Sequence, residues 1–459
     1  MYKIQFDSPV HVHFIGIGGI SMSGLAEILL KENFTVSGSD AKNSELTDRL
    51  QNEGAQIFIQ QKASNIIDGI DVVVYTAAIS KDNPELICAV EKGLPLLTRA
   101  ELLGQIMNNY AQSIAVSGTH GKTTTTSMLA SILLTSHQDP TISVGGMLKE
   151  IGGNIRVGNS DLFLTEACEY TNSYHSFFPK YSIILNVEED HLDFFHNIDD
   201  IRASFHKFAS NTAKDGILFI NNTIEKKDII LKDLPNRVYT FGIEDDADFI
   251  ADAVSFSEHG CAAFTVKKQG QTLASVSLQV PGMHNVANAV SAFALSYELG
   301  LPVEQIVSGL SAFGGTGRRF EKKGELGDIL IIDDYAHHPT EIQATLQAAR
   351  NYENRRIVCV FQPHTYTRTK AFWNEFAKAL SHADLVILAD VYAARETDTL
   401  GIHSKDLATE IEKLGTECHY FPSFEEIENY LLKKCTNKDL LITMGAGDIY
   451  KVGESLLGM

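Results

Sequence analysis

Two segments of the chain share a pattern in which an apolar, β-branched run meets a glycine-rich turn and then a helical pattern. The first is VHVHFIGIGGISMSGLAEILL, residues 10–30, and the second is SIAVSGTHGKTTTTSMLASILL, residues 113–134. Strands that alternate with helices in this way are typical of parallel sheets, because the crossover connections place helices on the sheet faces. The chain is therefore predicted to be an α/β protein, in which ligands bind at the carboxyl ends of the strands.

Strand-then-helix units recur along the whole chain and indicate about three domains. The length of 459 residues fits that number at ~150 residues per domain. The first block ends near a helical segment at 99–107, and the third begins near the glycine- and arginine-rich segment GTGRRFE. We expect the domains to span residues 1–108, 109–314 and 315–459.

Composition restricts the function classes that are open to the chain. With 58 acidic and 38 basic residues the formal net charge is −20, which argues against nucleic-acid partners because their binding surfaces are basic. The six cysteines are scattered without a CxxC pair, a pattern typical of free thiols in the cytosol. Neither a leader pattern nor an apolar run of ~20 residues is present, so we expect a soluble cytoplasmic protein without membrane insertion.

The second glycine loop has the properties of an ATP site. Its glycines let backbone N–H groups approach phosphate oxygens, and the N-terminus of the following helix favours negative charge. Lys122 is placed to reach the β- and γ-phosphates, and the Thr123 hydroxyl can bind Mg²⁺. Val116 stands where the usual pattern has its first glycine. The predicted ATP-binding residues of the loop are Gly118, Thr119, His120, Gly121, Lys122, Thr123 and Thr124.

Acidic residues at the ends of the next two predicted strands, residues 162–169 and 181–193, are candidate magnesium ligands. Glu166 closes the first of these strands and Glu169 follows three residues later. Carboxylate oxygens are ligands that Mg²⁺ prefers. His191 lies in the second segment, where a capping or core role is as compatible with the sequence as metal binding.

The first glycine cluster, Gly16, Gly18 and Gly19, resembles a dinucleotide-binding fingerprint but has Ser21 where a glycine is expected. Asp40 ends the second predicted strand, near the ~20-residue spacing of a ribose-binding acid. The pattern is compatible with NAD, with another diphosphate ligand, or with a tight turn that binds nothing.

The third block carries polar side chains directly after several predicted strands. Arg318 and Arg319 are suited to clamp phosphate oxygens with paired hydrogen bonds. In the central block, Asn285 and Asn288 are candidates to bind an adenine edge, with helix packing as the alternative for Asn288. The post-strand residues are Asp333, Asp334, Tyr335, His337, His338, His364, Tyr366, Arg368, Tyr392, Arg395 and Glu396. ATP at such a site is compatible with phosphoryl transfer, ligation or a motor-type ATPase.

A set of motifs in one fixed order gives these residues a more specific meaning. HFIGIGGISMSG, GTHGKTTTTSM, TEACEY, NVEEDHLD, GMHNVANA, RRFE, DDYAHHPTE and FQPHTYTRT extend from about residue 11 to about residue 450. Together they resemble the Mur ligase family. GTxGKT is shared by all Mur ligases and by folylpolyglutamate synthases, whereas DDYAHHPTE and FQPHTYTRT match best the members that add L-alanine.

The resemblance implies a Rossmann-like N-terminal domain for a UDP-sugar, a central P-loop-type ATPase domain and a Rossmann-like C-terminal domain for an amino acid. It implies a bacterial enzyme that uses ATP, with two Mg²⁺ ions expected, to join L-alanine to the lactyl carboxylate of UDP-N-acetylmuramate through an acyl phosphate. That reaction is the first peptide step of peptidoglycan precursor synthesis. The expected oligomeric state is a monomer or a weak homodimer.

The resemblance also implies residue roles. Thr123 and Glu166 would hold one Mg²⁺, and Glu166 with His191 a second. The implied catalytic residues are Lys122, Glu166, His191 and Arg319. Nucleotide contacts are implied for Asn285, Arg319 and Asp334, UDP-sugar contacts for Gly16, Gly18, Gly19, Asp40 and Glu169, and alanine contacts for Tyr335, His337 and Arg368.

Two positions depart from the family pattern. Thr365 stands where many alanine-adding members have an arginine, and the lysine that other members carbamylate falls near Phe205. Three alternatives stay open at this point. They are a recycling ligase that adds a tripeptide to the same sugar nucleotide, a nucleotide-dependent oxidoreductase, and a non-catalytic P-loop regulator.

Overall fold

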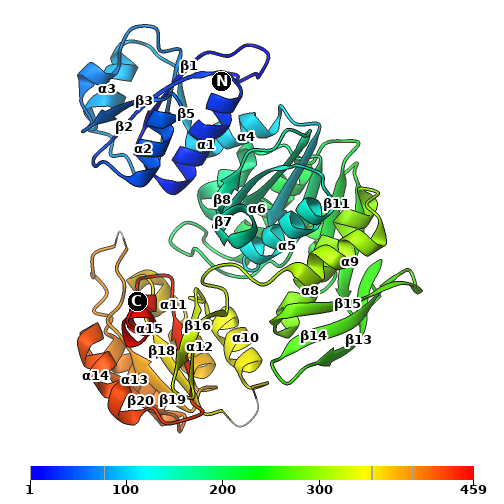
Figure 1. Cartoon of the computed structure of the whole chain (residues 1–459), viewed down its shortest axis with the longest axis vertical. Coiled ribbons are helices and arrows are strands. Elements are labelled where there is room, and N and C mark those ends of the chain that lie inside the picture. The colour runs from blue at the N-terminus through cyan, green and yellow to red at the C-terminus, as the bar shows by residue number, and fades with distance from the viewer. Residues whose placement is uncertain (1, 77, 245, 353–354, 395) are drawn as a thin grey trace.

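The computed structural model describes residues 2–76, 78–244, 246–352, 355–394 and 396–459. Three α/β domains follow one another along the chain, each built on its own sheet, and Figure 1 shows them in an open arc in which the central domain joins the other two. The α/β prediction is confirmed. The exact boundaries at residues 108 and 314 stay a prediction. No helix among the described residues is long and apolar enough to cross a membrane.

The N-terminal domain has a parallel five-stranded sheet in the order β3-β2-β1-β4-β5. Its strands are β1 His11–Ile15, β2 Thr35–Asp40, β3 Gln56–Ile59, β4 Val72–Tyr75 and β5 Leu96–Thr98. Its helices are α1 Ile20–Lys31, α2 Glu45–Asn52, α3 Pro84–Glu91 and α4 Arg99–Met107. The strand expected at 70–79 is shorter than the sequence suggested, and Ala77 within it lies outside the described residues.

The central domain has a ten-stranded sheet in the order β15-β14-β13-β12-β11-β10-β6-β9-β7-β8. The strands are β6 Gln112–Ser117, β7 Thr141–Leu148, β8 Gly153–Arg156, β9 Leu162–Ala167, β10 Tyr181–Ile184, β11 Ile217–Asn221, β12 Arg237–Ile243, β13 Phe249–Phe256, β14 Cys261–Lys268 and β15 Gln271–Pro281. The helices are α5 Lys122–Thr135, α6 Ile198–Ser210, α7 Lys227–Leu231, α8 Met283–Glu298 and α9 Val303–Ala312.

Both ends of this central sheet are antiparallel, a detail that the alternation of strands and helices did not predict. The pairs β13–β14, β14–β15 and β7–β8 run antiparallel. Along β14 every second residue is buried, the pattern of a strand with one face in solvent. Gln269 and Gly270 join β14 to β15 with positive φ at both positions, as the two-residue type I′ hairpin turn requires.

The C-terminal domain has a six-stranded sheet in the order β16-β17-β21-β18-β19-β20, with only the edge strand β16 antiparallel. The strands are β16 Glu321–Leu326, β17 Ile329–Asp334, β18 Ile357–Phe361, β19 Leu385–Leu388, β20 Glu417–Tyr420 and β21 Leu440–Met444. The helices are α10 Pro339–Ala349, α11 Tyr366–Ala371, α12 Trp373–Leu380, α13 Ser404–Lys413, α14 Phe424–Lys434 and α15 Tyr450–Leu456. Arg395, one of the polar residues noted after these strands, lies outside the described residues.

Close backbone contact fixes helix α9 against helix α5, the helix that carries the phosphate loop at its start. The Ser131 hydroxyl on α5 donates to the Gly309 carbonyl of α9 over 2.8 Å. A Cβ atom at Gly309 would lie 2.4 Å from the Ile132 Cα atom, a contact that only backbone movement can relieve. Gly309 therefore sets the distance between the two helices.

We expect Gly309→Ala to lower the free energy of unfolding of the central domain by about 1–3 kcal/mol, because overpacking a fixed backbone contact costs that much. Gly314→Ala is the matched control, since a Cβ there would meet no atom within 4 Å. Thermal unfolding followed by circular dichroism should give a lower Tm for Gly309→Ala and an unchanged Tm for Gly314→Ala. Equal Tm values for the two variants would show that the helices can separate without cost.

Candidate active site

The loop between β6 and α5 is shaped by two glycines that no other residue can replace without strain. Gly118 has φ +148° and Gly121 has φ +81°. Added Cβ atoms would lie 2.9 Å from Leu185 Cβ and 2.8 Å from Asn288 Oδ1, respectively. Gly121 is also the N-cap of α5, which has no side-chain cap, so the first N–H groups of this helix are free to bind an anion.

Lys122 starts α5 and places its ammonium group among oxygens of its own loop. Its Nζ donates to the Thr119 carbonyl at 3.0 Å and forms an ion pair with Glu169 Oε2 at 3.0 Å. Burial alone would lower the pKa of Lys122, but the charge and hydrogen bond of Glu169 together with other acidic neighbours outweigh burial and hold that pKa above its ordinary value. Lys122 is therefore a cation at neutral pH, held in place by a carboxylate.

Thr123 and Glu166 form a pair that fits a magnesium site. The Thr123 hydroxyl donates to Glu166 Oε2 at 3.1 Å, and the other carboxylate oxygen accepts from the N–H of Gly145. A hydroxyl and a carboxylate are hard oxygen donors of the kind that Mg²⁺ selects. Two of the predicted metal ligands, Thr123 at the start of α5 and Glu166 on β9, therefore contact each other.

His191 lies closer to the carboxylate of Glu169 than to that of Glu166, with which it was expected to bind a metal ion. Its Nε2 is 3.6 Å from Glu169 Oε1 and 3.7 Å from Asp190 Oδ2, whereas Glu166 contacts Thr123 and Gly145. Burial lowers the pKa of His191, although the neighbouring carboxylates oppose this shift. The imidazole is thus neutral at physiological pH and has a lone pair for a metal ion.

A cavity of about 570 Å³ joins these groups to the C-terminal domain. From the central domain it is lined by Lys122, Thr123, Glu166 and His191, among others. From the C-terminal domain it is lined by Arg318, Arg319, Tyr335, His337 and Glu341, among others. The arrangement places cations on both sides of one chamber and the candidate metal ligands on its central-domain side.

A second cavity of about 310 Å³ adjoins the chamber, with His120, Gly121, Arg319 and Glu341 lining both. The residues expected to contact a nucleotide meet here, since Thr124, Asn285, Arg319 and Asp334 all line it. Phe241, Phe313, Phe320, Leu185 and Val280 supply apolar surface for a flat base.

The two neighbouring arginines of RRFE have different surroundings. Arg318 pairs with the buried carboxylate of Asp333 at 3.0 Å and lies over the Tyr450 ring. Arg319 lies over the Tyr335 ring, 5.0 Å from its centroid, and lines both cavities. Of the two arginines, Arg319 is the one placed to bind a phosphate group.

Asp334 holds the backbone around Arg319. It accepts from the N–H groups of Phe320 at 2.9 Å and Ala336 at 2.7 Å. Burial raises the pKa of Asp334 to about 6, and the charge of Arg319 opposes part of that rise. Asp334 therefore orders the segment that presents Arg319 and also lines the smaller cavity.

Arg368, expected to bind an amino-acid carboxylate, already holds a protein carboxylate. Its Nε and Nη2 donate to Asp190 Oδ1 at 3.1 and 2.9 Å, and both side chains are more than nine-tenths buried. This charge pair keeps the pKa of Asp190 well below its ordinary range in spite of burial. Tyr335 and His337 line the chamber, while Arg368 lines an adjoining cavity of about 230 Å³ that shares Asp190 and His191 with the chamber.

The glycine loop of the N-terminal domain is held by Asp40. The Gly18 N–H donates to Asp40 Oδ2 at 2.9 Å, and a Cβ at Gly18 would lie 2.9 Å from the same oxygen. Gly16 has φ +87° and completes the turn, and Gly19 is the N-cap of α1, which has no side-chain cap. Asp40 therefore shapes the loop in addition to any ligand contact.

Glu169, expected with the UDP-sugar residues, lies beside Lys122 and His191 in the central domain. A residue that sequence reasoning missed, Arg99, lies near the N-terminal glycine loop instead. Its Nη1 donates to the Ser21 hydroxyl at 3.1 Å, and burial lowers its pKa. A single arginine at a helix start gave no signal in the sequence.

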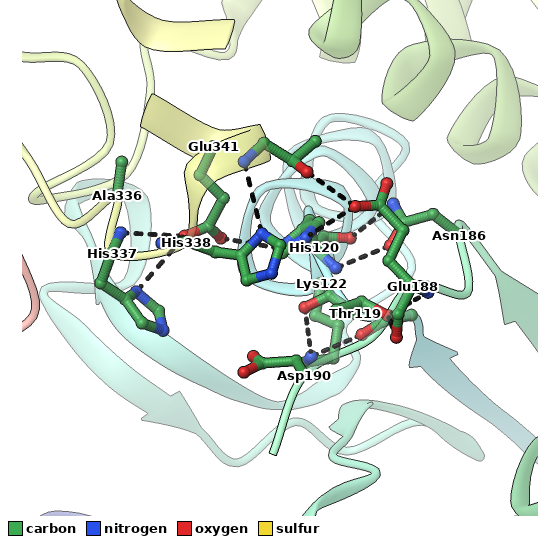
Figure 2. Close-up of polar contacts among 12 residues, drawn as sticks. Thr119, His120, Lys122, Asn186, Glu188, Asp190, Ala336, His337, His338 and Glu341 are labelled. Carbon is green, nitrogen blue, oxygen red and sulfur yellow. Dashed lines mark hydrogen bonds and ion pairs between the residues drawn. The ribbon is translucent and has the colours of Figure 1, made fainter. Parts of the chain in front are cut away.

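A cluster around His120 was also missed, because its members come from three separate segments (Figure 2). His120 Nδ1 is 3.1 Å from Glu341 Oε1, and His120 Nε2 is 3.5 Å from Glu188 Oε2. Within the described part of the chain, His120, Glu188 and His338 are the one group of three His, Cys, Asp or Glu residues whose ligand atoms lie within 4.8 Å of one another.

Comparisons with known proteins agree along the whole chain. Three family models match in order: the Mur ligase family catalytic domain over residues 11–111, the Mur ligase middle domain over 116–296, and the Mur ligase glutamate ligase domain over 318–447. A relative from Agathobacter rectalis, named UDP-N-acetylmuramate–L-alanine ligase, is 58% identical over 457 residues and is covered completely, as is this chain.

Solved structures agree with these sequence relatives. The crystal structure of UDP-N-acetylmuramate-alanine ligase from Thermotoga maritima has a TM-score of 0.80 and 31% identity, with 98% of each chain covered. A murein peptide ligase from Psychrobacter arcticus has a TM-score of 0.69 and 25% identity over the same shares of both chains. The sequence motifs, the three-domain fold and the full-length identity lead to one conclusion: the chain belongs to the Mur ligase family.

Proposed function

We propose that this protein uses ATP to join L-alanine to the lactyl carboxylate of UDP-N-acetylmuramate, with ADP and phosphate as the other products. The observation that carries the proposal is the chamber in which Lys122, Thr123 and Glu166 face Arg319 and Tyr335 across two domains. The 58% identity of the A. rectalis ligase over the full length supports the same reaction.

The first step requires a carboxylate to attack the γ-phosphorus of ATP. An oxygen–phosphorus bond forms to give an acyl phosphate, and the bond to ADP breaks. Lys122 on one side and Arg319 on the other are placed to neutralise charge on the transferred group. In phosphoryl transfer such positioning and charge stabilisation supply most of the catalysis.

In the second step the amine of alanine attacks the acyl carbon. A tetrahedral intermediate forms, an amide bond results, and phosphate leaves with the electrons of the broken carbon–oxygen bond. Tyr335 and His337 line the chamber where the amine must enter. Burial lowers the pKa of His337 to about 3, although Glu341 opposes the shift, so its imidazole is neutral at physiological pH.

Magnesium fits the donor groups that the structure brings together. Thr123 and Glu166 would hold one ion. His191 would hold a second ion, together with Glu166 or with its nearer neighbour Glu169. A bound Mg²⁺ supplies positive charge beside the triphosphate. The number of ions remains part of the proposal.

The nucleotide-sugar is proposed to lie against the glycine loop of the N-terminal domain. Gly16, Gly18 and Gly19 expose backbone at the uncapped N-terminus of α1, and Arg99 adds a guanidinium near Ser21. These groups suit a diphosphate. The use of ATP and a UDP-sugar supports a cytoplasmic location in a bacterium.

The alternative is a ligase that attaches a tripeptide to the same sugar nucleotide. The murein peptide ligase of P. arcticus, at a TM-score of 0.69 and 25% identity, is less similar than the T. maritima alanine ligase at 0.80 and 31%. Arg368, held by Asp190 in a small side cavity, is suited to the carboxylate of a small amino acid.

Phosphate release from ATP tests these substrates directly. With UDP-N-acetylmuramate present, we expect L-alanine to give the highest kcat/KM among L-alanine, glycine, L-serine and the tripeptide. A preference for tripeptide would assign the protein to recycling. If none of the four amines stimulates phosphate release, the ligase proposal is wrong.

Lys122→Ala should lower turnover by about 10³-fold, because it removes a cation that stabilises charge on the transferred phosphoryl group. The same change leaves Glu169 buried and unpaired, which destabilises the protein. The double variant Lys122→Ala/Glu169→Gln should regain thermal stability and remain inactive. Turnover near the wild-type rate in either variant would show that Lys122 has no role in the chemistry.

Arg368→Lys should raise the KM for L-alanine about tenfold or more and leave the KM for ATP unchanged, since an ammonium group cannot replace a guanidinium that binds one carboxylate through two N–H groups. Arg350→Lys is the matched control, because Arg350 forms an exposed pair with Asp384 at 2.8 Å in the same domain. Steady-state kinetics with each substrate varied in turn measures both constants. An unchanged alanine KM would place the amino-acid carboxylate elsewhere.

A further inference from the structure

His120 is part of the phosphate loop, but its side chain contacts residues of two domains. Figure 2 shows its ring between Glu188, which follows β10 in the central domain, and Glu341, in the first turn of α10 in the C-terminal domain. The distances are 3.5 Å to Glu188 Oε2 and 3.1 Å to Glu341 Oε1. The His338 ring, also from the C-terminal domain, lies 4.7 Å from the His120 ring between centroids.

The His120 ring is positively charged at neutral pH. Burial would lower its pKa, but the carboxylates of Glu341 and Glu188 outweigh burial and raise the pKa to about 9. His338 is neutral, because burial and the charge of His120 lower its pKa to about 4. Three further titratable or charged side chains face Glu341, namely Arg319, His337 and His284.

The charged His120 ring lies between the carboxylates of Glu188 and Glu341 and contacts both of them. The Thr340 hydroxyl donates to Glu188 Oε2 at 2.7 Å, which brings the two acidic segments together across the domain boundary. His338 Nε2 adds a contact with the Glu189 carbonyl at 3.1 Å. Without the imidazolium between them, the like charges of Glu188 and Glu341 would repel each other.

Glu341 also links this contact to the residues that line the nucleotide cavity. Its second oxygen accepts from the N–H of His337 and of His338, so its position is fixed by the start of α10. Arg319 and Asp334, from the same domain, line the cavity together with Gly121 and Thr124 of the central domain. The cavity is therefore complete only when the two domains meet.

We propose that His120 is a positioning residue whose imidazolium holds the C-terminal domain against the phosphate loop and so brings Arg319 to the bound nucleotide. This inference rests on the proposed function of the nucleotide cavity. His120 acts through Glu341 and Glu188, and the loop backbone binds the phosphates. Closure is then favoured while His120 is charged and weakened as pH rises through about 9.

A metal ion at His120, Glu188 and His338 is the competing explanation for the cluster. The hydrogen bonds argue against it, because His338 Nε2 lies on the Glu189 carbonyl and His338 Nδ1 accepts from the N–H of Thr340. Both ring nitrogens are thus engaged without a metal. Elemental analysis of the purified protein after dialysis against EDTA separates the two cases.

Binding of Mg·ADP in the absence of the other substrates tests the inference. Trp373 is the single tryptophan of the chain and follows Phe372, whose ring contacts His338 at 4.8 Å between centroids, so its fluorescence reports on this domain contact. We expect His120→Gln and Glu341→Gln each to raise the Kd for Mg·ADP about tenfold. Glu425→Gln, an exposed change on α14, should leave it unchanged.

Two further readouts separate a positioning role from a structural one. The double variant His120→Gln/Glu341→Gln should bind no more weakly than either single variant, since both break one interaction. The wild-type Kd should rise as pH passes through about 9, and that of His120→Gln should stay constant over the same range. Four outcomes would each overturn the proposal. The losses of Mg·ADP affinity could be additive in the double variant, or the single variants could bind with unchanged affinity. The wild-type Kd could be independent of pH, or the protein could retain stoichiometric metal after EDTA treatment.

Ligase turnover of the wild-type protein tests the proposed function separately. If alanine-dependent phosphate release is absent and the Mg·ADP measurements behave as expected, the positioning role of His120 is confirmed and the proposed reaction is wrong. If turnover is present and the variants bind Mg·ADP with wild-type affinity, the proposed reaction is confirmed and the positioning role of His120 is wrong.

Discussion

The parallel pairing of β6 with β9 and β10 is the constraint on which the site depends. Val116 on β6 lies opposite Glu166 on β9 and Ile183 on β10, so the three strands end at the same edge of the sheet. The phosphate loop, the acidic segment with Glu169 and the segment with His191 leave that edge together. Because these strands are mostly buried and carry many apolar core residues, a shift of register would move those residues out of the core, which fixes the geometry.

Buried carboxylates hold most of the cations that a phosphorylated ligand needs. Glu169 holds Lys122, Asp190 holds Arg368, and Asp333 holds Arg318. A chain with a net charge of −20 can thus keep basic groups at a binding site without leaving them unpaired. An incoming anion then competes with a protein carboxylate for each paired group, which makes binding an exchange of partners. Arg319 differs, since the described contact of its guanidinium is with a ring, that of Tyr335, and the carboxylates of Asp334 and Glu341 act on it through their charge. It is the arginine that lines both cavities.

Local patterns predicted the parts of the site that depend on neighbouring residues in the chain. Gly118, Gly121, Lys122 and Thr123 were identified because a strand, a glycine turn and a helix start have local signatures, and Val116 proved to be a buried strand residue. The resemblance implied nucleotide contacts for Asn285, Arg319 and Asp334, and these three residues from separate segments line one cavity. No single segment of the sequence shows that they lie together. The antiparallel hairpin β14–β15 was not predicted, although alternating burial and a Gln-Gly turn mark it.

Contacts between segments far apart in sequence could not be predicted from local patterns. The pairing of Asp190 with Arg368 and of His120 with Glu341 joins residues from different domains, and each residue by itself resembles an ordinary loop residue. The same holds for Asp40, whose bond to Gly18 becomes evident only when β2 lies beside β1. Sequence therefore predicts which groups are available, and packing decides which of them neutralise each other.

Asp190 and His191 are adjacent in the chain, yet they serve different partners. Asp190 binds Arg368 of the C-terminal domain, while His191 turns toward Glu169 and the central chamber, helped by a backbone with φ +52° at His191. A rotation of the C-terminal domain that moved Arg368 would act on Asp190, which is one peptide bond from His191. If His191 binds a metal ion in the proposed enzyme and its position depends on Asp190, then metal binding and domain rotation are linked, and each changes the other by the same factor.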